Sequence, residues 1–488
     1  MEKHFKEFKE RIVGNNQTFK TPYGEQKMIY ADWVASGRLY KDIEDIISHR
    51  FGPFVANTHT ETSETGTIMT KAYHHAKDII RNHVNACEND ILITSGFGMT
   101  GVVNKLQRIM GLKNCADFDP KTKTCIPKNN RPVVFVTHME HHSNQTSWYE
   151  TNAEVVLVEP GDDLLVDLDK LRKTVEKYKD RNLKIGSFSA CSNVTGIETP
   201  YHEMAQIMHE NQGLCFIDFA ASAPYVDIDM HPENKLQALD AIFFSPHKFL
   251  GGPGSSGVLL FNKELYSNAC PDQPGGGTVD WTNAWGEYKY SDNIEAREDG
   301  GTPGFLQAIK TALSIELKEK MGVENIRKRE HQLMKIVFER FPKIPGMNIL
   351  ADNVQDRVGA VSFFLDDVHF NLVVKLLNDR FGIQVRGGCA CAGTYGHLLL
   401  GVSIEESHRI TDMIDKGDLS LKPGWIRLSV HPTMTDNELY YICDAVEAIA
   451  NNHQEWAKDY TYDPHSNEFS HKDFADKDRY QIDDWFAF

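Results

Sequence analysis

The sequence predicts an α/β protein whose large domain has a mostly parallel sheet and is followed by a smaller α+β domain. Between residues 90 and 260, short apolar runs rich in β-branched residues alternate with stretches long enough for crossover helices. The runs lack the period-2 alternation of half-exposed strands, which is typical of strands buried on both faces of a parallel sheet. After Gly300 the pattern changes to helices interspersed with single strands.

The expected strands of the large sheet follow one another at regular intervals. They are DILIT (90–94), VVFVT (133–137), EVVLV (154–158), LKIGSFS (183–189), LCFID (214–218), DAIFF (240–244) and SGVLLF (256–261). The last run follows a short loop, so it is the expected antiparallel member of the sheet. In the second domain, helices are expected at about 303–321, 324–341, 368–381 and 435–453, with strands in VGAVSFFL, GIQVR and GWIRLSV.

These elements predict four parts of the chain. Residues 1–30 form an N-terminal segment that could pack with either domain, 31–300 the large domain, 301–453 the small domain and 454–488 an acidic, aromatic tail. We expect the tail to dock on the protein surface. Residues 113–131 are polar and rich in turn formers, which indicates a surface insertion between a helix and the second strand.

Composition limits the classes of function. The chain has 488 residues, 41% of them hydrophobic and 25% charged, as in ordinary globular proteins. The net charge of −17 disfavours nucleic acid and anionic membranes as partners. The N-terminus mixes acids and bases where a secretory signal needs an apolar core, and the nine cysteines are scattered. These features predict a protein of the reducing cytoplasm.

Polar residues follow five of the expected strands, at the edge where parallel sheets bind ligands. The segments are SGFGMTG, HMEHHSN, ACSNVTG, Asp218 and SPHK. The first has the glycine spacing of a dinucleotide-binding loop, but the next strand ends in Thr137 and His138 without the acid that would hold a ribose. A phosphate cradle made by the amides of Gly98, Met99 and Thr100 at a helix N-terminus is the preferred interpretation.

Lys248 lies just beyond a strand in an apolar, glycine-rich setting, beside Ser245 and His247. A lone lysine after a turn is usually a surface residue. Desolvation, however, would depress its pKa as an amine that forms a Schiff base requires. Together with an anion site and Asp218, it supplies the three groups that pyridoxal phosphate needs.

Several segments together carry a resemblance to a known family. SPHKFLGGPGSSGVLL, MEHHSN, SNVTG, FIDFAASAP and RGGCACA resemble the class V aminotransferase superfamily of fold type I pyridoxal 5'-phosphate enzymes. Within it, the chain is most similar to the group II cysteine desulfurases and selenocysteine lyases. The resemblance runs from YADWVASGR near residue 30 to about residue 435.

The resemblance implies a role for each matching residue. Lys248 would form the Schiff base and move the Cα proton, Asp218 would keep the pyridine nitrogen protonated, His141 would stack on the ring and Asn193 would lie beside the ring oxygen. Ala221 stands where the family usually has a glutamine, so the ring oxygen would lose one donor. The implied cofactor-binding residues are Gly98, Met99, Thr100, His141, Asn193, Asp218, Ser245, His247, Lys248 and, from a second subunit, Thr278.

The same resemblance implies which residues bind the substrate and which residue accepts its sulfur. Arg427 would bind the substrate carboxylate as a bidentate fork, assisted by Arg386. Cys391, five residues after Arg386, occupies the position of the family's nucleophile, and Cys389 replaces a residue that is often histidine. On a strand-like stretch, the Cys389 thiol is expected to point to the opposite face from Cys391. A buried structural pair or a two-thiol metal site is the alternative, but no second CxxC or paired histidines lie nearby, so no metal is predicted.

The sequence therefore predicts a homodimeric cysteine desulfurase that converts L-cysteine to alanine and leaves a persulfide on Cys391 for an acceptor protein. One alternative is a class V aminotransferase, or a selenocysteine or C–S lyase, that acts on another amino acid. From a different class, the alternative is a non-catalytic binding protein that keeps the fold.

Overall fold

A computed structural model describes residues 1–58, 60–113, 131–474 and 482–487. The chain divides into two compact units. Unit 1 comprises residues 1–35, 193–197 and 324–488, and unit 2 comprises residues 36–192 and 198–323. Most of the insertion expected at 113–131 lies outside the described residues, as do 475–481 and 488 of the tail.

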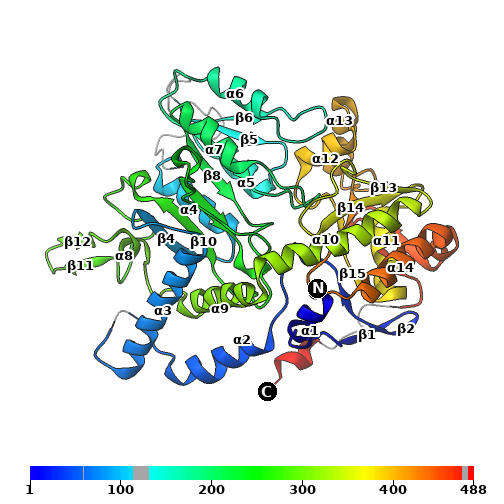
Figure 1. The fold of residues 1–488 in the computed structure, drawn as a ribbon, viewed down its shortest axis with the longest axis horizontal. Helices are drawn as coiled ribbons and strands as arrows, with labels where there is room; N and C mark the ends of the chain where they lie inside the picture. Colours follow the sequence, from blue (N-terminus) through cyan, green and yellow to red (C-terminus); the bar gives the residue numbers. More distant parts are fainter. Residues whose placement is uncertain (59, 114–130, 475–481, 488) are drawn as a thin grey trace. The chain divides into compact units, whose positions relative to one another are not determined.

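Unit 2 is built around a seven-stranded sheet in the order β4-β10-β9-β8-β7-β5-β6 (Figure 1). Strands β9, β8, β7, β5 and β6 pair in parallel, and β10 is antiparallel to both β4 and β9. The predicted α/β class and the antiparallel strand are therefore confirmed. The strands are β4 (Asp90–Ser95), β5 (Val133–Thr137), β6 (Glu154–Val158), β7 (Lys184–Ser189), β8 (Leu214–Asp218), β9 (Ala241–Phe244) and β10 (Gly257–Asn262).

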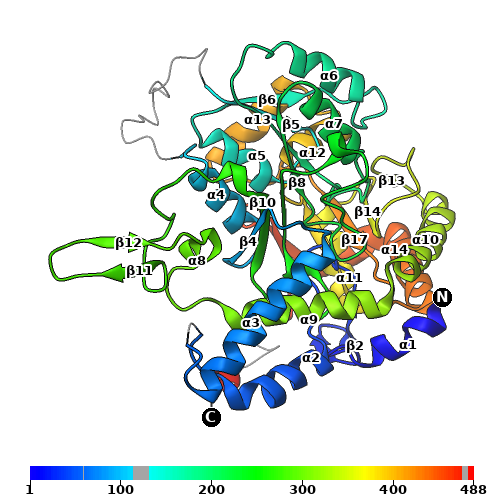
Figure 2. The same ribbon diagram turned by 60° about the vertical axis from the view of Figure 1, so that its left-hand side comes forward.

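Helices cover both faces of this sheet, and alternate residues of each strand enter different cores (Figure 2). In β5, Val133 and Phe135 join one core, whereas Val134 and Val136 join the other. The first core includes residues of α3 (Glu64–His83), α6 (Leu168–Glu176), α7 (Tyr201–Glu210) and α9 (Phe305–Met321). The second includes residues of α4 (Met99–Ile109) and α5 (His142–Tyr149). This two-sided burial explains why the strands read as continuous apolar runs.

A hairpin of β11 (Val279–Thr282) and β12 (Tyr288–Tyr290) projects from unit 2 (Figures 1 and 2). Its exposed aromatic side chains are Trp281, Trp285 and Tyr288. The remaining elements of this unit are short. They are α2 (Lys41–Ile46), α8 (Ile294–Glu298) and the single turns 47–51, 52–54, 235–237, 246–248 and 263–265.

Unit 1 contains an antiparallel sheet in the order β13-β14-β17-β16. Its strands are β13 (Met347–Ile349), β14 (Ala360–Leu365), β16 (Arg386–Gly388) and β17 (Trp425–Ser429). Its helices are α1 (Glu2–Glu10), α10 (Val323–Arg340), α11 (Phe370–Phe381), α12 (Gly393–Leu399), α13 (Ile404–Asp415) and α14 (Asp436–Trp456). The segment after the cysteine pair thus folds into two helices, α12 and α13.

The N-terminal residues belong to unit 1. Strands β1 (Thr18–Thr21) and β2 (Gly24–Lys27) form a hairpin, and β3 (Ile29–Tyr30) pairs in parallel with β15 (Ile383–Gln384). Lys9 of α1 forms an ion pair with Glu438, at the start of α14. These long-range contacts place the first boundary between units after Ala35 instead of after residue 30.

The second boundary also differs from the one predicted at residue 300. Helix α9 lies beside α3 and contributes Ile309 and Ala312 to a core with Met69 and Ala76, so residues up to 323 group with unit 2. The tail forms a hairpin of β18 (Tyr460–Asp463) and β19 (Glu468–His471). None of the helices within the described ranges is long and apolar enough to cross a lipid bilayer.

Candidate active site

The polar strand ends of unit 2 meet at one edge because β4, β5, β7, β8 and β9 run in the same direction. In the register of the sheet, Ser189 at the end of β7 lies opposite Asp218 at the end of β8. Asp218 in turn lies opposite Phe243, two residues before Ser245. The sheet therefore brings the predicted lysine, aspartate and glycine loop of this unit to a single edge.

The glycine loop and the segment after β9 form a cradle around Gly98. The backbone N–H of Met99 donates to the Ser245 Oγ at 2.9 Å. A Cβ atom on residue 98 would lie 3.0 Å from the Ser245 Oγ and 3.6 Å from the His247 Cδ2, so a side chain would fill the cradle. The Thr100 hydroxyl lies 2.7 Å from the Ser143 hydroxyl. Amides and hydroxyls at the start of α4 are suited to binding a phosphate.

Asp218 is a buried carboxyl group with 4% of its surface exposed. Its Oδ1 accepts a hydrogen bond from the Ala220 N–H at 2.8 Å. Burial raises the pKa of Asp218 to about 7, although the Ala220 amide and the Lys248 charge act in the opposite direction. A buried carboxylate in this state gains stability from a cationic partner such as a protonated ring nitrogen.

Glu140 anchors the segment that carries His141. Its two carboxylate oxygens accept hydrogen bonds from the hydroxyl groups of Thr137 and Ser189 and from the Asn144 amide, each at 2.7 Å. Burial nevertheless raises the pKa of Glu140. His141 caps α5, and its Nδ1 accepts from the Ser143 N–H at 3.1 Å. Glu140 therefore fixes where His141 lies.

We predict that Glu140→Ala lowers the free energy of unfolding by at least about 2 kcal/mol, because it leaves several buried donors without an acceptor. Chemical denaturation of the variant and the parent protein measures the difference. Glu150→Ala is the matched control, since Glu150 is an exposed acid just after α5. Equal stability of the Glu140→Ala variant and the parent would contradict the anchoring role.

Lys248 ends a single turn, Pro246–Lys248, that follows β9. The Gly37 N–H donates to the His247 carbonyl at 2.9 Å, and a Cβ on Gly37 would lie only 1.9 Å from the Phe249 carbonyl oxygen. This close approach requires glycine and holds the lysine segment in place. Burial, with a smaller contribution from Lys248, lowers the pKa of His247 to about 4, so its ring is neutral at physiological pH.

Thr278 is fully buried within one chain, and its hydroxyl donates to the Gly275 carbonyl at 2.6 Å. It lies at the base of the projecting β11–β12 hairpin. Asn193 belongs to unit 1, whereas the other residues expected to bind the cofactor belong to unit 2. Its side-chain amide donates to the Ala390 carbonyl at 2.7 Å.

Unit 1 holds an arginine pair around Asp32. On the neighbouring strands β16 and β17, Arg386 lies opposite Arg427. Arg427 donates to the Asp32 Oδ1 at 2.5 Å and to the Asn193 carbonyl at 3.1 Å, and Arg386 donates to the Asp32 Oδ2 at 3.1 Å. The Nε of Arg427 is buried without a hydrogen-bond partner in the described part of the chain. The pair is suited to binding a carboxylate.

The cysteine pair lies on a turn beyond β16. The expectation that a strand separates the two thiols is wrong, because the strand ends at Gly388 and residues two apart on a strand share one face. Ala390 and Cys391 have φ values of 48° and 57°, in the left-handed region that costs a non-glycine residue about 1–2 kcal/mol. The Asn193 bond to Ala390 helps to hold this conformation. Cys391 is exposed and Cys389 is partly buried.

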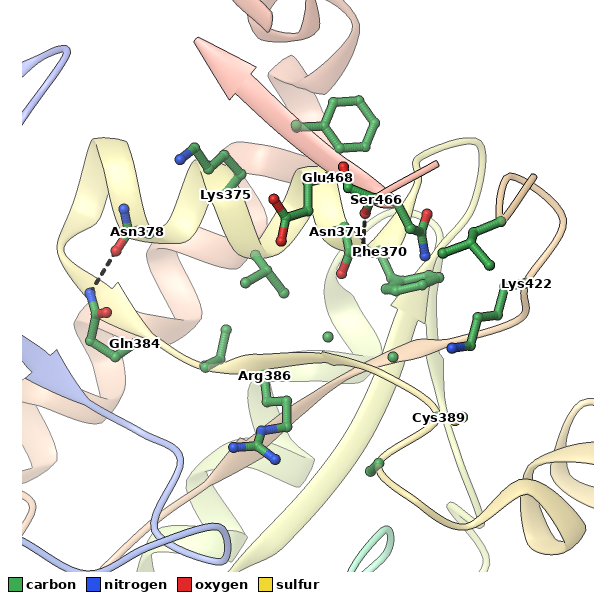
Figure 3. Close-up of a pocket in the computed structure, with 18 of the residues that line it drawn as sticks. Phe370, Asn371, Lys375, Asn378, Gln384, Arg386, Cys389, Lys422, Ser466 and Glu468 are labelled. Carbon is green, nitrogen blue, oxygen red and sulfur yellow. Dashed lines mark hydrogen bonds between the residues drawn. The ribbon is translucent and has the colours of Figure 1, made fainter. Parts of the chain in front are cut away.

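A cavity of about 710 Å³ lies beside this turn in unit 1 (Figure 3). Arg386, Cys389 and Cys391 line it, together with Lys422 and residues 466–470 of the tail hairpin. The tail docks here: the Asn371 side chain of α11 donates to the Asn467 carbonyl at 2.6 Å.

Sequence reasoning missed Asp32, Glu140 and Ser143 as members of these clusters. Asp32 lies within YADWVASGR and Glu140 and Ser143 lie within MEHHSN, so all three fall in segments already singled out for the resemblance. Arg427, the partner of Asp32, is 395 residues away, and Ser189, one of the partners of Glu140, is 49 residues away. The signal available in the sequence was an acidic residue that closely follows an apolar run, as Asp32 and Glu140 do.

Comparisons with known proteins show the family to which the chain belongs. The family Aminotransferase class-V matches residues 29–442. A probable cysteine desulfurase of Halalkalibacterium halodurans is 28% identical over 373 residues, which cover 75% of this chain and 84% of that protein. A probable cysteine desulfurase of Staphylococcus aureus strain Mu50 is 27% identical over 372 residues, with the same coverage of 75% and 84%.

Solved structures share the fold. A cysteine desulfurase from Thermococcus onnurineus NA1, solved in its apo form, has a TM-score of 0.72 at 21% identity and covers 91% of this chain and 98% of its own. The cysteine desulfurase CsdA from Escherichia coli has a TM-score of 0.68 at 20% identity, with coverage of 86% and 94%. With its parallel sheet, polar strand ends and family match over most of its length, the chain belongs to the aminotransferase class V family of enzymes.

Proposed function

We propose that this enzyme is a cysteine desulfurase that uses pyridoxal 5'-phosphate and transfers the sulfur of L-cysteine to Cys391. The observation that carries the proposal is the exposed Cys391 thiol on the turn after β16, in the unit that also holds the Arg386–Arg427 pair. An aminotransferase needs a lysine and an arginine but has no use for such a thiol. The named relatives support the same activity.

The residues of unit 2 fit the cofactor. The Gly98 cradle, with Met99, Thr100, Ser245 and His247, offers amide and hydroxyl donors and an imidazole for the phosphate. The buried Asp218 carboxyl is suited to a protonated pyridine nitrogen. When bound, pyridoxal phosphate withdraws electrons from the substrate Cα and so weakens the bonds around it. His141, fixed through Glu140, is proposed to contact the ring.

The protein residues then have separate roles. Arg427 and Arg386 bind the substrate carboxylate, and Asp32 orients both guanidinium groups. Lys248 moves the Cα proton. The Cys391 thiolate attacks the substrate Sγ: the Cβ–Sγ bond breaks, an S–S bond forms, and the electron pair left on Cβ takes up a proton. The products are L-alanine and a persulfide on Cys391, and no external oxidant or reductant is consumed.

The direct test is to incubate the purified protein with L-cysteine and a thiol reductant and to measure alanine and sulfide together. A desulfurase forms both in equal amounts. Formation of pyruvate from L-alanine and an acceptor keto acid, without sulfide from cysteine, would instead support an aminotransferase. Selenocysteine as the preferred substrate would support the lyase alternative.

We predict that Asp218→Asn stabilises the cofactor-free protein above pH 7 while weakening cofactor binding at least tenfold. The folded-state pKa of Asp218, about 7, exceeds the ordinary value of 3.8. Below pH 3.8, Asp218 is protonated in both the folded and the unfolded protein and does not affect stability. Between pH 3.8 and 7 it ionises in the unfolded protein but stays protonated in the folded protein, so the free energy of unfolding falls as the pH rises. Asparagine carries no such cost. Thermal melting of both cofactor-free proteins at pH 5 and pH 8 measures the change, and an equal difference at the two pH values would contradict it.

We also propose a cytoplasmic homodimer. The seven cysteines in the described part of the chain are free thiols, as in proteins of reducing compartments. The projecting hairpin, with Trp281 49% and Trp285 86% exposed, offers an apolar surface to a second copy, close to the base of the loop that carries Thr278. The sulfur acceptor is proposed to be a second protein that receives the persulfide.

We predict that the protein elutes as a dimer and that Trp281→Glu combined with Trp285→Glu shifts it toward the monomer, because the charges would be buried at the interface. Light scattering at several protein concentrations measures the mass. Ile404→Glu is the control, since Ile404 is an exposed apolar residue on unit 1. A parent protein that is monomeric with cofactor bound would contradict the dimer.

A further inference from the structure

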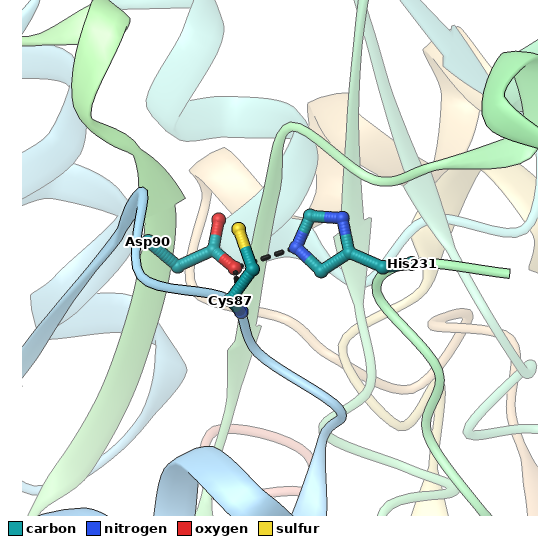
Figure 4. A group of neighbouring side chains, drawn as sticks. All are labelled: Cys87, Asp90 and His231. Atoms are coloured by element: carbon teal, nitrogen blue, oxygen red, sulfur yellow. Dashed lines mark hydrogen bonds and ion pairs between the residues drawn. The ribbon is translucent and has the colours of Figure 1, made fainter.

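Unit 2 gathers three potential metal ligands away from the strand ends described above. Cys87 precedes β4, Asp90 is the first residue of β4, and His231 follows β8 in the sequence. One ligand atom from each side chain lies within 4.8 Å of the other two. Figure 4 shows the thiol, the carboxylate and the imidazole turned toward one another. The fold therefore assembles three different donor atoms, and Asp90 and His231 are 141 positions apart in the sequence.

Asp90 has a carboxylate oxygen that no described residue satisfies with a hydrogen bond. Its side chain is almost completely buried, with a relative exposure of 1%. The Oδ2 accepts from the Cys87 N–H at 2.7 Å and contacts the His231 Nε2 at 2.6 Å. The Oδ1 is buried without a hydrogen-bond partner among the described residues. Leaving such an oxygen buried and unpaired is destabilising, and a bound cation would satisfy it.

The donor set selects the kind of cation. Calcium and magnesium bind almost entirely through oxygen. A thiolate, an imidazole and a carboxylate together suit Zn²⁺, which binds sulfur, nitrogen and oxygen in tetrahedral geometry. We propose that Cys87, Asp90 and His231 bind one Zn²⁺ ion, with water in the fourth position.

Binding requires only a local rearrangement. Ligand atoms around one tetrahedral Zn²⁺ lie about 3.3–3.8 Å apart. The present separations of up to 4.8 Å must shorten, and the 2.6 Å contact between the His231 Nε2 and the Asp90 Oδ2 must open. The Oδ1 then binds the metal while the Oδ2 keeps its bond from the Cys87 N–H. The unpaired oxygen thus becomes the third ligand.

Hydrogen bonds around the cluster already hold both ligand-bearing segments. The Asp229 Oδ1 accepts from the His231 N–H at 3.0 Å and from the Asn85 side chain at 2.7 Å. The Met230 N–H donates to the Val84 carbonyl at 3.0 Å. Such supporting bonds orient metal ligands and reduce the cost of assembling the site.

A cavity of about 470 Å³ lies alongside and provides an approach for the ion. Cys87 and Asp90 line it, as do the acidic residues Glu88 and Asp292. Their negative charge favours entry of a divalent cation. Bound there, Zn²⁺ joins the start of β4 to the segment after β8 and stabilises unit 2 without taking part in the reaction proposed above.

Cobalt substitution tests this proposal on the protein with its own cofactor bound. After dialysis against a chelator, the protein is titrated with Co²⁺, whose tetrahedral complexes have ligand-field bands at longer wavelengths than the absorption of pyridoxal phosphate. We expect one equivalent to give the ligand-field band of a tetrahedral site, and one equivalent of Zn²⁺ to abolish the band and raise the melting temperature. Absence of the band, or no change in melting temperature with Zn²⁺, would overturn the site.

Variants assign the band to these residues. Cys87→Ser removes this ligand-field band, and His231→Gln, which keeps the thiol, weakens Co²⁺ binding at least about tenfold. Cys270→Ser removes an exposed thiol of the same unit and leaves the band unchanged. A Cys389→Ser/Cys391→Ser double variant also keeps it, which excludes the cysteine pair as its source. A band that persists in Cys87→Ser, or that disappears only in the double variant, would overturn the assignment.

Discussion

Lys248→Ala is expected to abolish the covalent link between the protein and pyridoxal phosphate. Turnover of L-cysteine should fall by at least about 10²–10⁴-fold, because the group that moves the Cα proton is lost together with the link. Borohydride reduction followed by peptide mass spectrometry locates the link in the parent protein. We expect the cofactor on the peptide that contains Lys248 and no trapped cofactor in the variant.

Lys318→Met is the matched control for this experiment. Burial lowers the pKa of Lys318 to about 8, so more of this amine is neutral at physiological pH, as formation of a Schiff base requires. Its Nζ, however, donates to the Val226 carbonyl at 2.5 Å and lies 5.8 Å from the centre of the Phe249 ring, so it is already engaged within the protein. The control variant should keep the link. Cofactor trapped on Lys318, or a reducible link that survives in Lys248→Ala, would contradict the assignment.

Cys391→Ser is expected to reduce alanine formation from L-cysteine by at least about 100-fold, with the loss in kcat and little change in KM. The substitution removes the attacking thiolate but leaves Arg386, Arg427 and the residues of unit 2 in place. Cys389→Ser is the matched control on the same turn and should keep more activity, because Cys389 is partly buried whereas Cys391 is exposed. Steady-state alanine measurements on both variants make the comparison.

Comparing selenocysteine with cysteine as substrates distinguishes a defect in thiol attack from a defect in substrate binding. Selenium leaves carbon more readily than sulfur, so we expect Cys391→Ser to retain turnover of selenocysteine while it loses turnover of cysteine. Loss of both activities would show that the substitution damages substrate binding. Unchanged turnover of cysteine would rule out Cys391 as the sulfur acceptor and favour the aminotransferase alternative.

The sequence predicted the large sheet well because its strands are short, apolar and buried on both faces. Runs such as VVFVT and LCFID coincide with β5 and β8. The rule that ligands bind at the carboxyl ends of parallel strands then directed attention to Asp218 and Lys248 without any knowledge of side-chain contacts.

The features that the sequence did not predict depend on contacts between distant segments. Asp32 pairs with Arg427 from 395 residues away, and α9 packs on α3 across the boundary expected at residue 300. Cys87, Asp90 and His231 lack the spacing of a known metal motif, so only the folded chain shows them together. The left-handed backbone at Cys391 is likewise a property of the turn and not of its composition.

The most direct test of the account is a single turnover of L-cysteine on the cofactor-loaded enzyme without reductant. Peptide mass spectrometry then locates the transferred sulfur, and amino-acid analysis measures the alanine released. The account predicts one additional sulfur atom on Cys391 and one alanine for each sulfur transferred. Alanine released without sulfur on Cys391, or sulfur found on another cysteine alone, would contradict it.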